Sequence, residues 1–272
     1  MSEIDTWKQW RRLREEGLAV EFGWLTLSSY QWLPPEPGPV EFFPGRFGGG
    51  PGGAVYVPDP AQDAVVEYDA GTPVTAPLAR ALGEGASVFW LRHGGTLVEL
   101  GLRDGRYMIR TREQHHPALE SFHGVPVFDY DPAWVLAGRF EPYEAERTES
   151  IGSYRADLRL TATAVGDVVF EAGGRSHRLA AEEGADGSLV LNFHDGTNGD
   201  STADWRFLSV PAPAPDGLVV LDFNRTLNYP FAFSRFAACP MPLHGNRLEL
   251  AVTAGERIPV DGDHIAQDGH SV

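Results

Sequence analysis

Two polar blocks in the second half of the chain carry the residues that could do chemistry. The first reads HDGTNGDSTADWRF at 194–207, and the second reads DFNRTLNYPFAFSRFAACPMPLHGNR at 222–247. Pro230, Pro240 and Pro242 fix the backbone of the second block and remove amide donors, so we expect a rigid loop there. Because such polar side chains are costly to order without partners, we interpret the two blocks as the floor of one binding site.

The guanidinium and amide groups of these blocks are suited to holding a small anion. Guanidinium forks bind a carboxylate or a phosphate through two hydrogen bonds, and side-chain amides can orient the bound group. The residues that we expect to bind the substrate are Asn198, Arg206, Asn224, Arg225, Asn228 and Arg247. The alternative is that each arginine pairs with a nearby acid, such as Asp195 or Asp222, and only ties a loop to the sheet.

Asp195 is the residue that we expect to be catalytic, because a carboxylate beside a bound anion can take up and release protons. Asp222 is the second candidate for this role. His194 precedes Asp195, but neighbouring residues of a strand face opposite ways. We therefore expect no dyad between these two residues.

Cys239 could act as a thiolate nucleophile, with His194 or His244 as its base. However, the cysteine lies in the apolar segment AACPMP, which disfavours a thiolate. A small buried cysteine is the better interpretation.

A histidine cluster offers the chemistry of a metal site. It consists of His115, His116 and His123, with Asp129 and Asp131 close behind. Adjacent histidines of an extended chain point to opposite faces, and the spacing matches no zinc motif. We therefore expect a solvated loop, and the prediction includes no metal and no cofactor.

Charge and cysteine content exclude several classes of partner and site. The net charge is −16, which repels phosphate backbones and anionic membrane surfaces, so we expect neither nucleic acid nor a membrane as a partner. One cysteine excludes an intrachain disulfide. The start of the chain is charged, and no apolar run approaches roughly 18 residues. We therefore expect a soluble cytoplasmic protein. The oligomeric state stays open.

The elements that position the polar blocks are predicted to be mainly strands. Residues 3–18 have the spacing of an amphipathic helix, which Asp5 could cap and Gly17 could end. Short alternating runs with turn residues between them follow, which is typical of antiparallel sandwich-like or barrel-like sheets. The glycine-rich segment 41–54 is expected to be an exposed, mobile loop.

The predicted organisation has five parts. They are an N-terminal helix at 1–19, a small β-sandwich-like unit at 20–112, an irregular connection at 113–132, a second β unit with the site at 133–260, and a polar tail at 261–272.

Three segments of the chain resemble one protein family. They are WKQWRRLREEGLA…GWLTLSSYQWL, HDGTNGDSTADWRFLSV, and DFNRTLNYPFAFSRFAACPMPLHGNRLELAVTAGE. Together they are similar to the domain-of-unknown-function family 1684. The resemblance implies a β-rich fold and assigns no activity. Where the family pattern has Thr-Tyr-Gly, this chain has Thr202-Ala203-Asp204, so a tyrosine hydroxyl that could act as an acid or base is absent.

The sequence thus predicts a metal-independent cytoplasmic enzyme, of hydrolase or lyase/cyclase type, that acts on a small anionic metabolite. The first alternative is a β protein that binds a small ligand without catalysis. The second is a structural role, in which the proline-rich loop covers a sheet edge and its side chains satisfy backbone groups.

Overall fold

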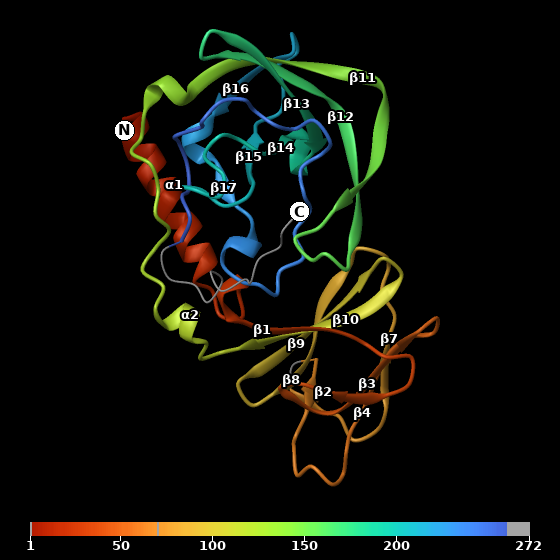
Figure 1. Ribbon diagram of the computed structural model, residues 1–272. Coiled ribbons are helices and arrows are strands. Elements are labelled where there is room, and N and C mark those ends of the chain that lie inside the picture. Colours follow the sequence, from red (N-terminus) through yellow and green to blue (C-terminus); the bar gives the residue numbers. More distant parts are fainter. Residues whose placement is uncertain (1, 70, 260–272) are drawn as a thin grey trace. The chain divides into compact units, whose positions relative to one another are not determined.

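The computed structural model describes residues 2–69 and 71–259, which form two compact units (Figure 1). The C-terminal unit comprises residues 2–15, 123–233 and 238–259, and the N-terminal unit comprises 16–69, 71–122 and 234–237. Every pairing between named strands is antiparallel. The prediction of a mainly β fold with an N-terminal helix is confirmed. The predicted tail at 261–272 lies outside the described residues.

Helix α1 (Glu3–Leu18) occupies the residues that the sequence predicted. Ser2 takes the capping role expected for Asp5. Its Oγ donates to the Asp5 carboxylate at 2.7 Å, and the Asp5 amide donates back to Ser2 Oγ at 3.3 Å. The helix continues through Gly17 and does not end there. Among the described residues, no helix is long and apolar enough to cross a membrane.

A single seven-stranded sheet dominates the C-terminal unit. Its strand order is β16-β11-β12-β13-β14-β15-β17. The strands are β11 (Val135–Gly152), β12 (Arg159–Ala172), β13 (Arg175–Glu183), β14 (Leu189–Phe193), β15 (Arg206–Val210), β16 (Leu218–Asp222) and β17 (Leu227–Asn228). Figure 1 shows the long β11–β12 hairpin curving over the shorter strands. The alternation of these strands contributes to one buried apolar cluster, which includes Leu191, Phe193 and Phe223.

Two sheets form the N-terminal unit. A six-stranded sheet has the order β1-β10-β9-β8-β5-β6, and a four-stranded sheet has the order β2-β3-β4-β7. The first contains β1 (Leu27–Trp32), β5 (Glu67–Tyr68), β6 (Thr72–Pro73), β8 (Ser87–His93), β9 (Thr96–Arg103) and β10 (Arg106–Glu113). The second contains β2 (Gly38–Val40), β3 (Phe43–Gly50), β4 (Gly53–Val57) and β7 (Leu78–Arg80). One apolar cluster takes residues from both sheets, including Phe47, Tyr56, Leu100 and Ile109.

The glycine-rich segment 41–54 is not the exposed mobile loop that the sequence predicted. Most of it forms the β3–β4 hairpin, and Phe47 inside it is 0% exposed. Its glycines give room to neighbours, since a Cβ on Gly49 would lie 2.7 Å from the Cβ of Tyr107. In the predicted irregular connection, the short helix α2 (Pro117–Glu120) begins after His116, whose ring nitrogen accepts from the Ala118 amide.

Gly255 sits at a tight approach between two backbone segments of the C-terminal unit. Its φ is +79°, and a Cβ there would lie 2.5 Å from the carbonyl oxygen of Thr226. Only glycine meets both demands without strain.

We therefore expect Gly255→Ala to lower the free energy of unfolding by roughly 2–4 kcal/mol, because a left-handed backbone and overpacking both oppose it. Gly199→Ala is the matched control. Gly199 has φ +77°, but nothing lies within 4 Å of the place that a Cβ would occupy, so its loss should be roughly 1 kcal/mol. Urea denaturation measures both, and equal losses would contradict this account.

Candidate functional site

A buried ion pair joins the two ends of the first polar block. Arg206, at the start of β15, donates to the Asp195 carboxylate at 2.8 Å, and both side chains are 0% exposed. The guanidinium also donates to the carbonyl oxygens of Val252, Ala254 and Glu256 at 2.9, 2.7 and 3.0 Å. Burial lowers the pKa of Arg206, and the Asp195 charge opposes this shift. The pair therefore cross-links the loop after β14 to the segment 252–256.

This arrangement bears on two expectations for the site. The Asp195 side chain is 0% exposed and paired with Arg206, which favours a structural role, and its expected catalytic role stays a prediction. Arg206 already donates to one carboxylate and three carbonyl groups, so it is not available to an external anion. Here the alternative interpretation, an arginine paired with a local acid, describes the structure better.

Three of the predicted residues of the second block have partners within the chain. Arg225 donates to the Asp222 carboxylate at 3.0 Å. The Asn224 side chain accepts from the Asp131 amide at 2.9 Å and donates to the Asp131 carbonyl oxygen at 3.0 Å. Asn228 donates to the Arg257 carbonyl oxygen at 2.8 Å. These contacts tie loops together, and they do not bring the arginines to one place.

Asn198 has the same kind of role in the first block. Its Oδ1 accepts from the Asp195 amide at 2.7 Å, and its Nδ2 donates to the Ala203 carbonyl oxygen at 2.7 Å. The turn from 195 to 203 is thereby closed by one amide side chain. Asn198 thus shapes the loop, and its expected role in substrate binding stays a prediction.

Glu256 is a buried charge that sequence reasoning missed. It is 1% exposed and accepts from Arg11 at 3.2 Å, from Arg14 at 3.1 Å and from the Asn228 amide at 2.7 Å. The contacts fix helix α1 to the loops of the C-terminal unit. A sequence signal existed, because Arg11 and Arg14 lie on one face of the predicted helix at a spacing of three residues.

His194 and Arg247 lie side by side because two short segments run parallel at this point. The His194 amide donates to the Asn246 carbonyl oxygen at 2.9 Å, and the Leu248 amide donates to the His194 carbonyl oxygen at 2.8 Å. His194 and Arg247 are the partners of this parallel bridge. Asp195 points into the core, so strand alternation directs the preceding His194 the other way.

Asn246 holds the Arg247 loop in register. Its side chain accepts from the Ala180 amide at 2.8 Å and donates to the carbonyl oxygens of Ala180 and Asn192 at 2.8 and 2.9 Å. The asparagine is 3% exposed. Both strands β13 and β14 thus fix the backbone that carries Arg247.

These segments enclose a pocket of about 260 Å³, which we name the Arg247 pocket. Its lining residues are Ile151, Gly152, His194, Met241, Pro242, Leu243, His244, Gly245, Asn246 and Arg247. The volume lies below the usual range for drug-sized ligands, and it suits a small carboxylate or phosphate group. Of the predicted substrate-binding residues, Arg247 is the one that lines it.

His194 is held as a neutral imidazole with one free nitrogen. Its Nδ1 lies 2.9 Å from the Asp204 carbonyl oxygen, which only accepts, so the proton belongs on Nδ1 and Nε2 has the lone pair. Burial lowers the pKa of His194 below 6.5, the Asp204 carbonyl opposes this, and the charge of Arg247 lowers the pKa further. A neutral histidine of this kind can accept a proton at neutral pH.

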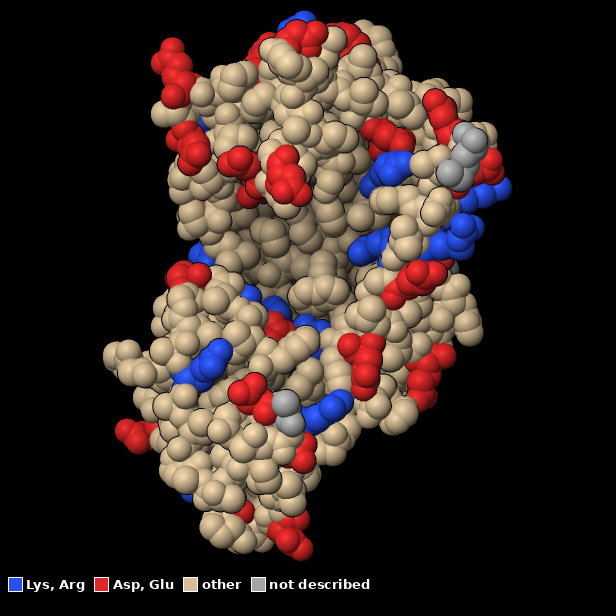
Figure 2. Space-filling model, turned by 180° about the vertical axis from the view of Figure 1, so that it is seen from behind, with Lys and Arg blue, Asp and Glu red and all other residues tan. Residues whose placement is uncertain are grey.

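Arg247 is exposed and has no ion pair with an acid among residues 2–69 and 71–259. The chain has a net charge of −16, and Figure 2 shows acidic side chains spread over the visible surface of both units. At the pocket rim, His244 Nδ1 lies 2.9 Å from Glu149, which also accepts from the His244 amide at 2.8 Å. The pocket therefore has one unneutralised cation beside one neutral base.

The other candidate clusters of the sequence have different surroundings. Cys239 is 5% exposed, and the two histidines considered as its base bond to Asp204 and Glu149. His115 lies 3.8 Å from Glu120, and Asp131 accepts from the Ala133 amide. In the described part of the chain, no group of three or more His, Cys, Asp and Glu residues could hold a metal ion.

Residues 120–257 match a protein family whose description is "Protein of unknown function (DUF1684)". Among solved structures, the chain is similar to an uncharacterized protein of Haloarcula marismortui, with 30% sequence identity, 51% of this chain and 78% of that chain covered, and a TM-score of 0.42. No curated protein matches the chain. The matched family range contains both polar blocks and every residue that lines the Arg247 pocket.

Proposed function

This chain belongs to the DUF1684 family, and we propose that it is an enzyme that binds a small anionic substrate in the Arg247 pocket. The observation that carries the proposal is the exposed guanidinium of Arg247, which has no acid partner in the described part of the chain. A guanidinium group binds carboxylate and phosphate oxygens through charge-assisted hydrogen bonds. The pocket volume of about 260 Å³ limits the ligand to a small molecule or to the acidic end of a larger one.

His194 supports the catalytic part of the proposal. Its free Nε2 and lowered pKa suit a general base that removes a proton from water or from a carbon beside an acid group. Both hydrolase and lyase chemistry use such a step. The residues with named roles are thus Arg247, which holds the anion, and His194, which moves the proton.

The proposed enzyme uses no metal. We also propose that it works in the cytoplasm, and the single cysteine fits a reducing compartment. A binding protein without catalysis would use the same contact between Arg247 and the anion. Two experiments separate these possibilities.

The first experiment tests binding with Arg247→Gln. We expect inorganic phosphate or acetate to bind the parent protein, and the variant to bind it roughly ten- to a hundredfold more weakly, because a charge-assisted contact is lost. Isothermal titration calorimetry measures both. Arg175→Gln is the control, since Arg175 is another exposed arginine of the same unit, 71% exposed in its side chain, and its loss should leave binding unchanged. Equal affinity in Arg247→Gln and the parent would contradict the proposal.

The second experiment tests His194→Asn. We expect the variant to lose turnover of small anionic probes by at least roughly a hundredfold, while phosphate binding at about pH 8 stays within roughly threefold. Acetyl phosphate hydrolysis and deuterium uptake by pyruvate are the two assays. Because burial lowers the pKa of His194 from its usual value, the imidazole is neutral near pH 7 and its protonation adds positive charge as the pH falls. Sulfate binding to the parent should therefore strengthen as the pH falls from about 7 to about 5.

The same pH series on His194→Asn should rise less steeply, because the contribution of His194 is lost while His244 remains in the pocket. The parent protein is also assayed against a panel of small acids and their phosphates. If it binds anions but turns over none of these probes, the proposal of catalysis is wrong and the protein only binds its ligand.

A further inference from the structure

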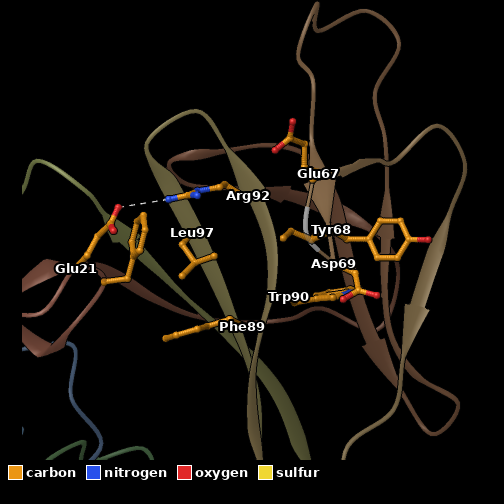
Figure 3. A pocket seen from close by; sticks show the side chains of 11 residues that line it. Glu21, Glu67, Tyr68, Asp69, Phe89, Trp90, Arg92 and Leu97 are labelled. Carbon is orange, nitrogen blue, oxygen red and sulfur yellow. Dashed lines mark ion pairs between the residues drawn. The ribbon is translucent and has the colours of Figure 1, made fainter.

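Two histidines, His194 and His244, line the Arg247 pocket. The pocket of the N-terminal unit in Figure 3 is larger, about 670 Å³, and has a different chemistry. Glu21 and Arg92 form an ion pair there at 3.6 Å, and no histidine is among the described residues that line it. Imidazole is the side-chain group that gains and loses a proton most readily near neutral pH. The Arg247 pocket therefore holds two groups that are suited to proton transfer.

The two rings have partners of different charge. The Nδ1 of His194 lies 2.9 Å from the carbonyl oxygen of Asp204, and burial lowers the pKa of this histidine. The Nδ1 of His244 lies 2.9 Å from the Glu149 carboxylate, and the His244 side chain is 76% exposed. A carboxylate at Nδ1 stabilises an imidazolium, which has a proton on each ring nitrogen. Surroundings that differ in this way make one group of a pair the base and the other the acid.

Glu149 fixes both the backbone and the ring of His244. One carboxylate oxygen accepts from the His244 amide at 2.8 Å, and the other lies 2.9 Å from the His244 Nδ1. Burial raises the pKa of Glu149, but the hydrogen bonds and charge of His244 outweigh burial, so the pKa is lowered and the carboxylate is ionised. Glu149 does not line the pocket itself. It therefore acts through His244, whose Nε2 is the ring nitrogen left to face a ligand.

The loop that carries this histidine is anchored on β11. The Met241 amide donates to the Gly152 carbonyl oxygen at 3.0 Å, and Leu243 belongs to the same buried apolar cluster as Ile151. Ile151 and Glu149 are two residues apart in β11, so they lie on one face of the strand. The strand that supplies the carboxylate thus also fixes the loop, and a group held in this way needs little reorganisation when it transfers a proton.

The neighbourhood of Arg247 and His194 indicates which atom of a substrate reacts. The two residues are partners of one parallel bridge, so an anion held by Arg247 lies next to His194. The atom that an activated water attacks therefore belongs to the anion itself. A phosphate ester fits this arrangement, because its phosphorus bonds both to the charged oxygens and to the leaving oxygen.

We propose that His244 is the general acid of the enzyme, that Glu149 is its positioning residue, and that the substrate is a small phosphate ester. This inference rests on the proposed function, in which Arg247 holds the anion and His194 is the base. The Arg247 guanidinium binds the phosphate oxygens. His244 then supplies the proton that the leaving oxygen needs.

These roles give a balanced hydrolysis. The Nε2 of His194 takes a proton from water, and the water oxygen forms a bond to phosphorus. The bond between phosphorus and the leaving oxygen breaks, and its electron pair takes the proton from the Nε2 of His244. The products are inorganic phosphate and an alcohol or phenol. His194 ends with one more proton and His244 with one fewer, and exchange with solvent restores both.

The test compares two esters that differ in their leaving group. The oxygen of phenol needs a proton when phenyl phosphate is hydrolysed, whereas 4-nitrophenolate leaves 4-nitrophenyl phosphate without one. In His244→Asn, the new amide can still donate to Glu149 but supplies no proton. We expect kcat to fall at least roughly a hundredfold on phenyl phosphate and less than roughly tenfold on 4-nitrophenyl phosphate. His115→Asn is the matched control and should change neither rate, since His115 is 81% exposed and lies 3.8 Å from Glu120 in the N-terminal unit.

Glu149→Gln tests the positioning role. Glutamine keeps a side-chain oxygen for the His244 amide and removes the charge. We expect kcat on phenyl phosphate to fall roughly ten- to a hundredfold, while KM and phosphate binding stay within roughly threefold. The rate on 4-nitrophenyl phosphate should change less, whereas a purely structural role would lower both rates alike. Glu249→Gln is the control and should change neither rate, since Glu249 is 84% exposed in the same unit.

The general-acid role is overturned if His244→Asn lowers both rates equally or lowers neither. It is also overturned if the parent protein binds phosphate but does not hydrolyse phenyl phosphate, and this result leaves the anion site intact. Failure of the proposed function gives a different result, because Arg247→Gln would then bind phosphate as tightly as the parent protein does.

Discussion

The ion pair between Asp195 and Arg206 is the interaction on which the C-terminal unit depends. Both side chains are 0% exposed, and the two terminal nitrogens of the guanidinium group also donate to three carbonyl groups of the segment 252–256. A buried pair of this kind adds little net stability over an apolar core, but removing one partner leaves a buried charge. The pair thus specifies which loops meet. The same network reaches helix α1, because the Glu256 carboxylate accepts from Arg11 and Arg14.

The Arg247 pocket is a consequence of this constraint. Once Asp195 points inward, strand alternation directs His194 outward, and the parallel bridge to Arg247 sets the two side chains beside each other. Asn246 then anchors the Arg247 loop to β13 and β14. A site assembled by rigid backbone contacts needs little ordering when a ligand binds, and this favours the binding of even a small anion.

The sequence predicted the fold better than it predicted the site. Helix α1 and the antiparallel strands follow from periodicity and turn residues, which are local signals. The polar blocks were correctly singled out as the ordered loops of the unit, but most of their side chains satisfy backbone groups. Which member of the His194–Asp195 pair faces the core depends on contacts such as that of Asp195 with Val252, 57 positions away, and no local pattern contains that information.

The buried ion pairs of Glu99 with Arg110 and Arg112 in the N-terminal unit escaped notice for a related reason. Arg110 and Arg112 lie two residues apart in one strand, which is a readable signal of a shared polar face. Their partner Glu99 becomes apparent only when the register of β9 and β10 is known. The prediction of a mobile loop at 41–54 was wrong for the opposite reason. The composition of this segment is typical of a loop, but β3 and β4 pair there as a hairpin.

The most direct test of this account compares the unfolding free energies of Asp195→Asn and Asp200→Asn, measured by urea denaturation. Asp200 is an exposed acid of the same loop, so its loss should change stability by no more than about 0.5 kcal/mol. Removing the Asp195 charge leaves Arg206 buried without its carboxylate, and the account predicts a loss of roughly 3–5 kcal/mol. If both variants were as stable as the parent protein, the buried pair would not be the interaction that organises this unit.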